Sequence, residues 1–190
     1  SEKGQLDEAM DYYRKALKLQ SDSARAFCNL GAALFQQDKM AEATDHYERA
    51  LRFQPEHARA HNNLGVALVQ QGRVPEAMSH YGQALRLRPT YAEAHNNLGI
   101  ALKDLWQFES AAASYRRALE LKPDFAEAYN NLGLVLQECA ARAAVKCRDA
   151  RAHGQGAPRR LAVGRQEPPR RADRRRVRGA VPAAAPRRVA

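Results

Sequence analysis

Cysteine is scarce in this 190-residue sequence, which contains only Cys28, Cys139 and Cys147 and no Cys-x-x-Cys pair. An odd number of thiols disfavours a disulfide framework, and the lack of closely spaced pairs disfavours a structural zinc site. This use of cysteine fits a reducing compartment, and we therefore expect a cytoplasmic protein.

Long apolar runs are also missing, since no stretch reaches the roughly 18 consecutive apolar residues of a membrane-spanning helix. No signal peptide is present, but the chain does not begin with Met and opens inside a repeated unit, so we expect a fragment of a longer protein. Neither a Gly-rich phosphate loop nor a recognisable Ser, His and Asp arrangement occurs. We expect no enzymatic activity, no cofactor, no metal and no membrane partner.

Acidic residues are nearly absent from the last 40 residues, where 12 arginines accompany only Glu167 and Asp173. This segment accounts for the whole formal net charge of +10, because residues 1–150 carry 19 basic and 19 acidic side chains. The segment after Cys147 has no Ile, Phe, Tyr, Trp or Met, so it cannot bury a core and is predicted to be disordered. Three interpretations stay open: a basic arm that binds nucleic acid, an inert tail, or the product of a reading-frame shift in a GC-rich gene.

The rest of the sequence repeats every 34 residues. The phrase "AHNNLG" occurs at 60–65 and 94–99, and the variants "AFCNLG" and "AYNNLG" occur at 26–31 and 128–133. Its glycines are Gly31, Gly65, Gly99 and Gly133. The same step relates a leucine (Leu34, Leu68, Leu102, Leu136), a small residue (Ala9, Ala43, Ala77, Ala111), an aromatic residue (Tyr13, Tyr47, Tyr81, Tyr115) and a proline (Pro55, Pro89, Pro123).

Each unit contains two apolar stripes at helical spacing, one around the leucines and one around the aromatic residue, which predicts two amphipathic helices. Gly72 and Gly4 match the left-handed residue that ends a helix, whereas Trp106 takes the place of Gly72 in the next unit and weakens that prediction there. A glycine inside a helix costs about 1 kcal/mol relative to alanine. Its recurrence therefore predicts a close approach of the two helices, with the Ala43-type side chain facing the Gly31-type gap.

Histidines also recur at this step, as His46 with His80 and His61 with His95. Recurrence at the structural period indicates packing or surface roles rather than metal ligands, because a metal site needs a third ligand nearby.

These positions resemble the tetratricopeptide repeat family, whose pattern places a bulky residue, Leu-Gly, a small residue, an aromatic residue and a proline at the same spacing. The resemblance covers Leu6 to about Cys139 and implies an all-α fold, a right-handed superhelical solenoid of antiparallel helix pairs. The predicted parts are a partial repeat (1–23), three repeats (24–57, 58–91 and 92–125), a partial repeat holding a first helix (126–147) and the disordered tail (148–190).

The resemblance also implies that the first helix of each unit lines a concave groove. The residue before each Leu30-type leucine is rotated about 100° from it, towards this groove. These residues are Asn29, Asn63, Asn97 and Asn131. Because an amide can both donate and accept, each can pair with a passing backbone. Other groove candidates on the same face are Arg25, Arg59, Glu93, Glu127, Asn62, Asn96 and Asn130. The alternative is that the asparagines cap or pack locally.

The predicted function is a non-catalytic scaffold that binds an extended peptide or protein segment. A clamp for carboxyl-terminal acidic tails is disfavoured, since its basic positions hold Cys28, Ala32, Glu93 and Asn97. The asparagine row and the "AHNNLG" phrase are similar to the repeats of O-linked N-acetylglucosamine transferases and their bacterial relatives. The alternative function is therefore the substrate-recruiting part of such a glycosyltransferase, without its catalytic domain. Nucleic acid is expected as a partner only through the basic tail.

Overall fold

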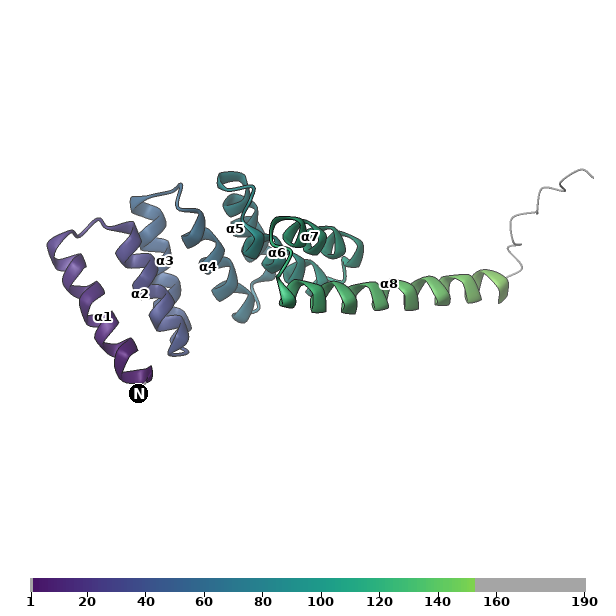
Figure 1. Cartoon of the computed structure of the whole chain (residues 1–190), viewed down its shortest axis with the longest axis horizontal. Coiled ribbons are helices and arrows are strands. Elements are labelled where there is room, and N and C mark those ends of the chain that lie inside the picture. The colour runs from purple at the N-terminus through teal and green to yellow at the C-terminus, as the bar shows by residue number, and fades with distance from the viewer. Residues whose placement is uncertain (1, 153–190) are drawn as a thin grey trace, which may run out of the picture.

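The structure, a computed structural model, describes residues 2–152, which form eight α-helices and no strand (Figure 1). The helices are α1 (Glu2–Leu19), α2 (Ala24–Gln36), α3 (Met40–Phe53), α4 (Ala58–Gln70), α5 (Val74–Leu87), α6 (Ala92–Asp104), α7 (Phe108–Leu121) and α8 (Ala126–Ala152). The all-helical prediction is confirmed. None of the helices in this part of the chain has the length and apolar character needed to cross a bilayer.

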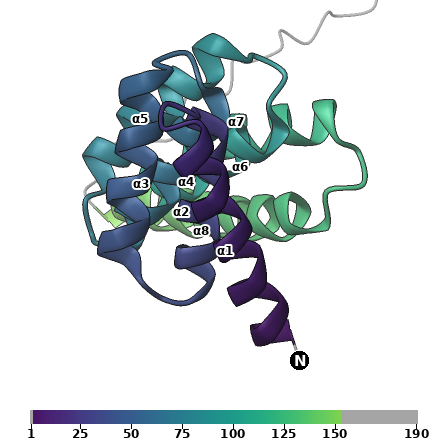
Figure 2. The same cartoon turned by 90° about the vertical axis from the view of Figure 1, so that its left-hand side faces the viewer.

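The helices pair as hairpins, α2 with α3, α4 with α5 and α6 with α7, and each hairpin packs on the next. The helices α2, α4, α6 and α8 also contact one another in order, so they form one continuous row, called here the inner row. Helices α1 and α8 lie at opposite ends of the stack (Figure 1). Viewed from the α1 end, α1 crosses in front of the other helices (Figure 2). The predicted solenoid is confirmed.

The recurring glycines allow the two helices of a hairpin to approach closely, as predicted, but the residue that fills the gap is different. A Cβ atom added at Gly65 would lie 2.6 Å from Cε1 of Tyr81, and one at Gly31 would lie 2.8 Å from Cε1 of Tyr47. The neighbouring Ala43 contributes its backbone oxygen, 3.2 Å from the Gly31 position, rather than its side chain. The glycine therefore makes room for a buried aromatic ring.

The turn inside each hairpin has one residue in the left-handed region: Asp38 (φ 62°), Gly72 (φ 77°) and Trp106 (φ 61°). In all three turns the following amide bonds back to the helix, as in the 2.9 Å bond from Arg73 N–H to Leu68 O. Gly72 is thus the predicted cap, and the third unit keeps the same turn although Trp106 stands there. The prediction for Gly4 is wrong, because Gly4 lies inside α1.

Helix α8 differs from the other inner helices by its length of 27 residues. The period places a turn near residue 139, but the alanine-rich sequence that follows has high helix propensity and continues the helix to Ala152. The segment predicted to be disordered from residue 148 therefore begins inside a helix. The same prediction for residues 153–190 lies outside the described residues.

Candidate functional site

The candidate site is the inner row, where one asparagine pair or its counterpart occupies the fifth and sixth residues of each helix. The second asparagine of each pair donates to the first position of the pair on the preceding helix. Asn97 Nδ2 donates to Asn62 Oδ1 at 2.9 Å, and Asn131 Nδ2 donates to Asn96 Oδ1 at 3.1 Å. Asn63 Nδ2 contacts Cys28 Sγ in the same register, at 3.9 Å. These three contacts are called here the asparagine ladder.

The ladder divides the predicted groove asparagines into two groups. Asn62 and Asn96 are only 5% and 1% exposed, so they lie in the seam between inner helices and are not accessible to a guest chain. Their amides are satisfied there: Asn62 Nδ2 donates to Asn63 Oδ1 at 3.3 Å, and Asn96 Nδ2 donates to Glu127 Oε1 at 3.1 Å. A buried amide needs such partners because leaving it unpaired costs about 1–3 kcal/mol.

The other asparagines keep contact with the surface. Asn29, Asn63, Asn97 and Asn131 are half-buried, and Asn130 is exposed. Asn97 and Asn131 each use one N–H for the ladder, so a second N–H and the oxygen have no partner among the described residues. Asn29 Oδ1 accepts from an Nη of Arg59. The row therefore presents unpaired amide groups mainly towards the α6 and α8 end.

The four charged groove candidates, one at the second position of each inner helix, are all exposed. Arg25 and Arg59 occupy one end of the row, and Glu93 and Glu127 occupy the other. Lys122 Nζ lies 3.4 Å from Glu93 Oε1, a pair that compensates part of the acidic end. Charged side chains at this position of the inner row thus change from positive to negative along its length.

A small cavity of about 230 Å³ opens where α1, α2 and α4 meet. Its wall combines Tyr13 of α1 with Asn29 and Gln36 of α2 and with Arg59 and Asn63 of α4. Three of the predicted groove residues, Asn29, Arg59 and Asn63, therefore line the same small cavity. Sequence reasoning did not identify Tyr13 as part of this wall, because the period assigns that position to the core.

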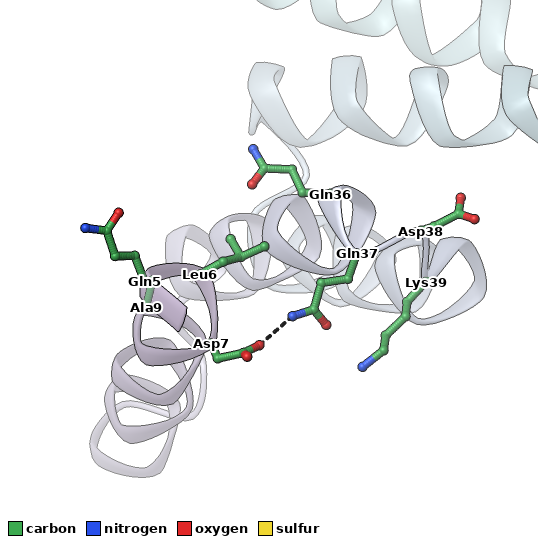
Figure 3. A pocket seen from close by; sticks show the side chains of 8 residues that line it. All are labelled: Gln5, Leu6, Asp7, Ala9, Gln36, Gln37, Asp38 and Lys39. Atoms are coloured by element: carbon green, nitrogen blue, oxygen red, sulfur yellow. Dashed lines mark hydrogen bonds between the residues drawn. The ribbon is translucent and has the colours of Figure 1, made fainter. Parts of the chain in front are cut away.

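A larger hollow of about 1010 Å³ lies beside this cavity, between the start of α1 and the turn after α2 (Figure 3). Leu6 and Ala9 line it from α1, and Gln36, Gln37 and Lys39 line it from the end of α2 and its turn. Gln37 Nε2 donates to Asp7 Oδ1 at 2.7 Å across one side of the hollow (Figure 3).

His61 and His80 pack against each other within the second repeat, which agrees with the packing or surface role that their recurrence indicated. His61 Nδ1 lies 3.0 Å from His80 Nδ1, and His61 Nε2 lies 3.0 Å from the carbonyl oxygen of Pro55. Burial lowers the pKa of both imidazoles, because it disfavours their charged forms. No group of three or more candidate metal ligands occurs among residues 2–152.

Known proteins are similar to this chain in sequence and in fold. Residues 22–90 match a family model described as tetratricopeptide repeat, and residues 2–38 and 107–138 match a second model described as TPR repeat. The first TPR domain of Spaghetti (RPAP3), solved with the HSP90 peptide SRMEEVD, is 30% identical with a TM-score of 0.61, and the match covers 64% of this chain and 96% of that one.

Two further structures are similar over most of both chains. MamA is 26% identical with a TM-score of 0.66, over 76% of this chain and 85% of that one. YrrB, described as a TPR protein with an unusual peptide-binding site, is 27% identical with a TM-score of 0.60, over 73% and 72%. No curated protein matches the chain in sequence.

Proposed function

Because the chain belongs to the tetratricopeptide repeat family, we propose that it is a non-catalytic scaffold that binds an extended segment of another protein along the inner row. Structures of similar fold support this role, since the RPAP3 domain holds an HSP90 peptide and YrrB has a peptide-binding site. No observation on residues 2–152 favours the glycosyltransferase alternative, which stays a prediction.

The observation that carries the proposal is the set of unpaired amide groups on Asn97 and Asn131. An N–H and an oxygen on one side chain match the C=O and N–H of an extended backbone. Packed helices lie about 8–10 Å apart, and an extended chain advances about 3.3 Å per residue. Successive asparagines would therefore meet about every third residue of a guest, largely independently of its side chains.

The ladder gives this contact a fixed geometry. Each asparagine that faces the guest is held by the helix before it, so its amide loses little rotamer freedom when the guest binds. The gradient from Arg25 and Arg59 to Glu93 and Glu127 would set the direction of the guest. A segment with acidic residues at one end and basic residues at the other would align with it.

The test uses the 190-residue chain and a peptide selected against it from a random library. Replacing Asn97 and Asn131 by Ala should weaken binding about tenfold, since each removed hydrogen bond contributes about 0.5–1.5 kcal/mol. Asn62→Ala is the matched control, because it breaks the same Asn97–Asn62 bond but leaves the Asn97 amide in the groove.

Titration calorimetry measures the affinities, and melting curves verify that the variants are folded. We expect Asn62→Ala to lose less affinity than Asn97→Ala. Equal affinity of the double variant and the parent chain would contradict the proposal, as would a library that yields no binding peptide.

A further inference from the structure

The asparagine ladder repeats one geometry at a constant step, and this restricts the conformation of a guest chain. Asn97 and Asn131 each donate to the preceding inner helix in the same register, so their unpaired amide groups take equivalent places on α6 and α8. Neighbouring inner helices pack closely, with Cα atoms within 8 Å of each other, and packed helices have axes about 8–10 Å apart. A guest that pairs with successive asparagines must present equivalent backbone groups at this interval.

A polyproline II helix presents its backbone at that interval. It has three residues per turn and rises about 3.1 Å per residue, so residues three apart face the same side and lie about 9.3 Å apart. In a β-strand, residues on the same side are two apart, at about 6.6 Å, and residues three apart face opposite sides. A polyproline II helix also has no internal hydrogen bonds, so its N–H and C=O groups are free to pair with amides. The step of the ladder therefore matches this conformation and not a strand.

Three rows of side chains cross the inner helices in parallel, because residues four before and three after a ladder asparagine lie on the same face of its helix. The residues four positions before, called here the charged row, are Arg25, Arg59, Glu93 and Glu127. The residues three positions after, called here the aliphatic row, are Ala32, Val66, Ile100 and Leu134. The amides of the ladder therefore lie between a charged row and an aliphatic row.

The aliphatic row is partly accessible in the middle of the stack. Val66 and Ile100 pack against the core on one side, yet both are only half-buried. The residues that follow them, Ala67 and Ala101, are fully buried. Part of each aliphatic side chain is thus exposed beside the asparagine of its helix, and an apolar side chain of a guest would cover this surface.

We propose that the guest of the inner row is a polyproline II segment whose residues repeat in threes, an inference that rests on the scaffold function proposed above. In each turn, one apolar side chain packs on the aliphatic row and one charged side chain faces the charged row. The charged residues are acidic over Arg25 and Arg59 and basic over Glu93 and Glu127, because opposite charges attract. The third residue of each turn faces solvent.

Proline suits this third position. Its ring fixes φ at about −65°, close to the value in a polyproline II helix. Proline therefore holds the free guest near its bound conformation, which reduces the entropy that the guest loses on binding. The guest class is thus a proline-containing segment with an apolar residue at every third position, acidic at one end and basic at the other.

The probe is a synthetic peptide of four turns, one for each inner helix. Each turn contains a leucine, a proline and a charged residue, which is glutamate in two adjacent turns and lysine in the other two. The peptide is made in both orders of charge, and the order that binds more tightly is used. The control peptide has the same composition, but its leucines lie two residues apart.

Fluorescence anisotropy of labelled peptides measures their affinity for the 190-residue chain. The probe should bind at least about tenfold more tightly than the control peptide, since burial of a leucine that the control leaves in solvent favours binding by about that factor or more. This comparison tests the period of three, because the two peptides differ only in the order of their residues.

The double variant Val66→Thr with Ile100→Thr tests the aliphatic row. Threonine keeps the β-branched shape and has a similar helix propensity, but it replaces apolar carbon by a hydroxyl. The probe should bind about tenfold more weakly, because each apolar carbon removed from a contact lowers affinity by up to about fourfold. Val74→Thr is the matched control, since Val74 is also half-buried against the core but begins α5, which is not part of the inner row. Melting curves verify that the variants are folded.

Nuclear magnetic resonance gives the register of the bound probe. Nuclear Overhauser contacts from the methyl groups of Val66 and Ile100 should reach leucines that are three residues apart in the peptide. Contacts to side chains two residues apart would show a strand and would overturn the proposal.

This inference and the scaffold function fail in different ways. Suppose that replacing Asn97 and Asn131 by Ala weakens the library-selected peptides, but the probe binds no better than the control peptide. The scaffold function then stands and the polyproline II guest is wrong. The same conclusion follows if the double threonine variant binds the probe as tightly as Val74→Thr does. If the asparagine replacements change no affinity at all, the scaffold function itself is contradicted.

Discussion

The close approach at Gly65 is the packing feature that most directly tests how the repeat is held together. In a free helix, Gly65→Ala would stabilise the protein by about 1 kcal/mol through helix propensity. Here the new Cβ atom would lie 2.6 Å from Cε1 of Tyr81 and 2.9 Å from its Cδ1. Tyr81 is only 2% exposed, so its ring cannot move into solvent.

The loss of stability expected for Gly65→Ala follows from the contact between the new Cβ atom and the Tyr81 ring. Overpacking a well-packed core costs about 1–3 kcal/mol. Gly82→Ala is the control, because Gly82 also lies inside a helix but has nothing within 4 Å of the added atom. The propensity gain is similar at both sites, so the difference between the two free energies of unfolding isolates the contact. We expect Gly65→Ala to be less stable than Gly82→Ala by about 1–3 kcal/mol.

Urea unfolding followed by far-ultraviolet circular dichroism measures this difference. For a domain of this size it corresponds to a separation of about 2–12 °C in the melting temperature. The double variant Gly65→Ala with Tyr81→Leu should recover part of the loss, because the smaller side chain vacates the contact. If Gly65→Ala proves as stable as Gly82→Ala, the close-approach argument is wrong.

Two further predictions concern the turns and the histidines. Asp38→Gly should raise the free energy of unfolding and Gly72→Ala should lower it, each by up to about 1–2 kcal/mol. The reason is that both positions have a positive φ, which favours glycine. Urea titration of the two variants measures whether the changes have opposite signs. Burial lowers the pKa of His61 and His80 in the folded state. The unfolded chain therefore binds more protons as the pH falls below about 6.5, so stability should decrease from pH 7 to 5, and His61→Phe should reduce that decrease in urea titrations at each pH.

The sequence predicted the helix pairs and the glycine register because both depend on spacing along one chain segment. It did not predict which residue fills the Gly65 gap, since Tyr81 lies on the other helix of the hairpin and the period gives no distance between helices. The sequence also did not predict the left-handed turn at Trp106, because glycine is absent from that position. Glycine adopts a left-handed backbone conformation at the lowest cost, but Asp38 and Trp106 adopt it as well. The packing of the two flanking helices holds the backbone of the turn in this conformation.

The groove was predicted less completely than the fold. Rotation about the helix axis separates the asparagines from the leucines, but it cannot distinguish Asn62 from Asn63. Which of two adjacent amides becomes buried depends on where the next inner helix lies, and α6 begins 34 residues after the start of α4. The structure buries Asn62 in the seam and leaves Asn63 half-buried beside the cavity.

The burial of a side chain depends on the neighbouring helices, so residues at the same position of the repeat have different surroundings at the ends of the stack. Tyr13 and Tyr47 occupy the same position of the repeat, yet only Tyr47 is buried, because α2 covers it and no helix of the described chain covers Tyr13. The helices of a repeat are therefore stable only when the helices of the neighbouring units cover their apolar faces. The asparagine ladder follows the same rule, because each of its contacts joins two neighbouring inner helices.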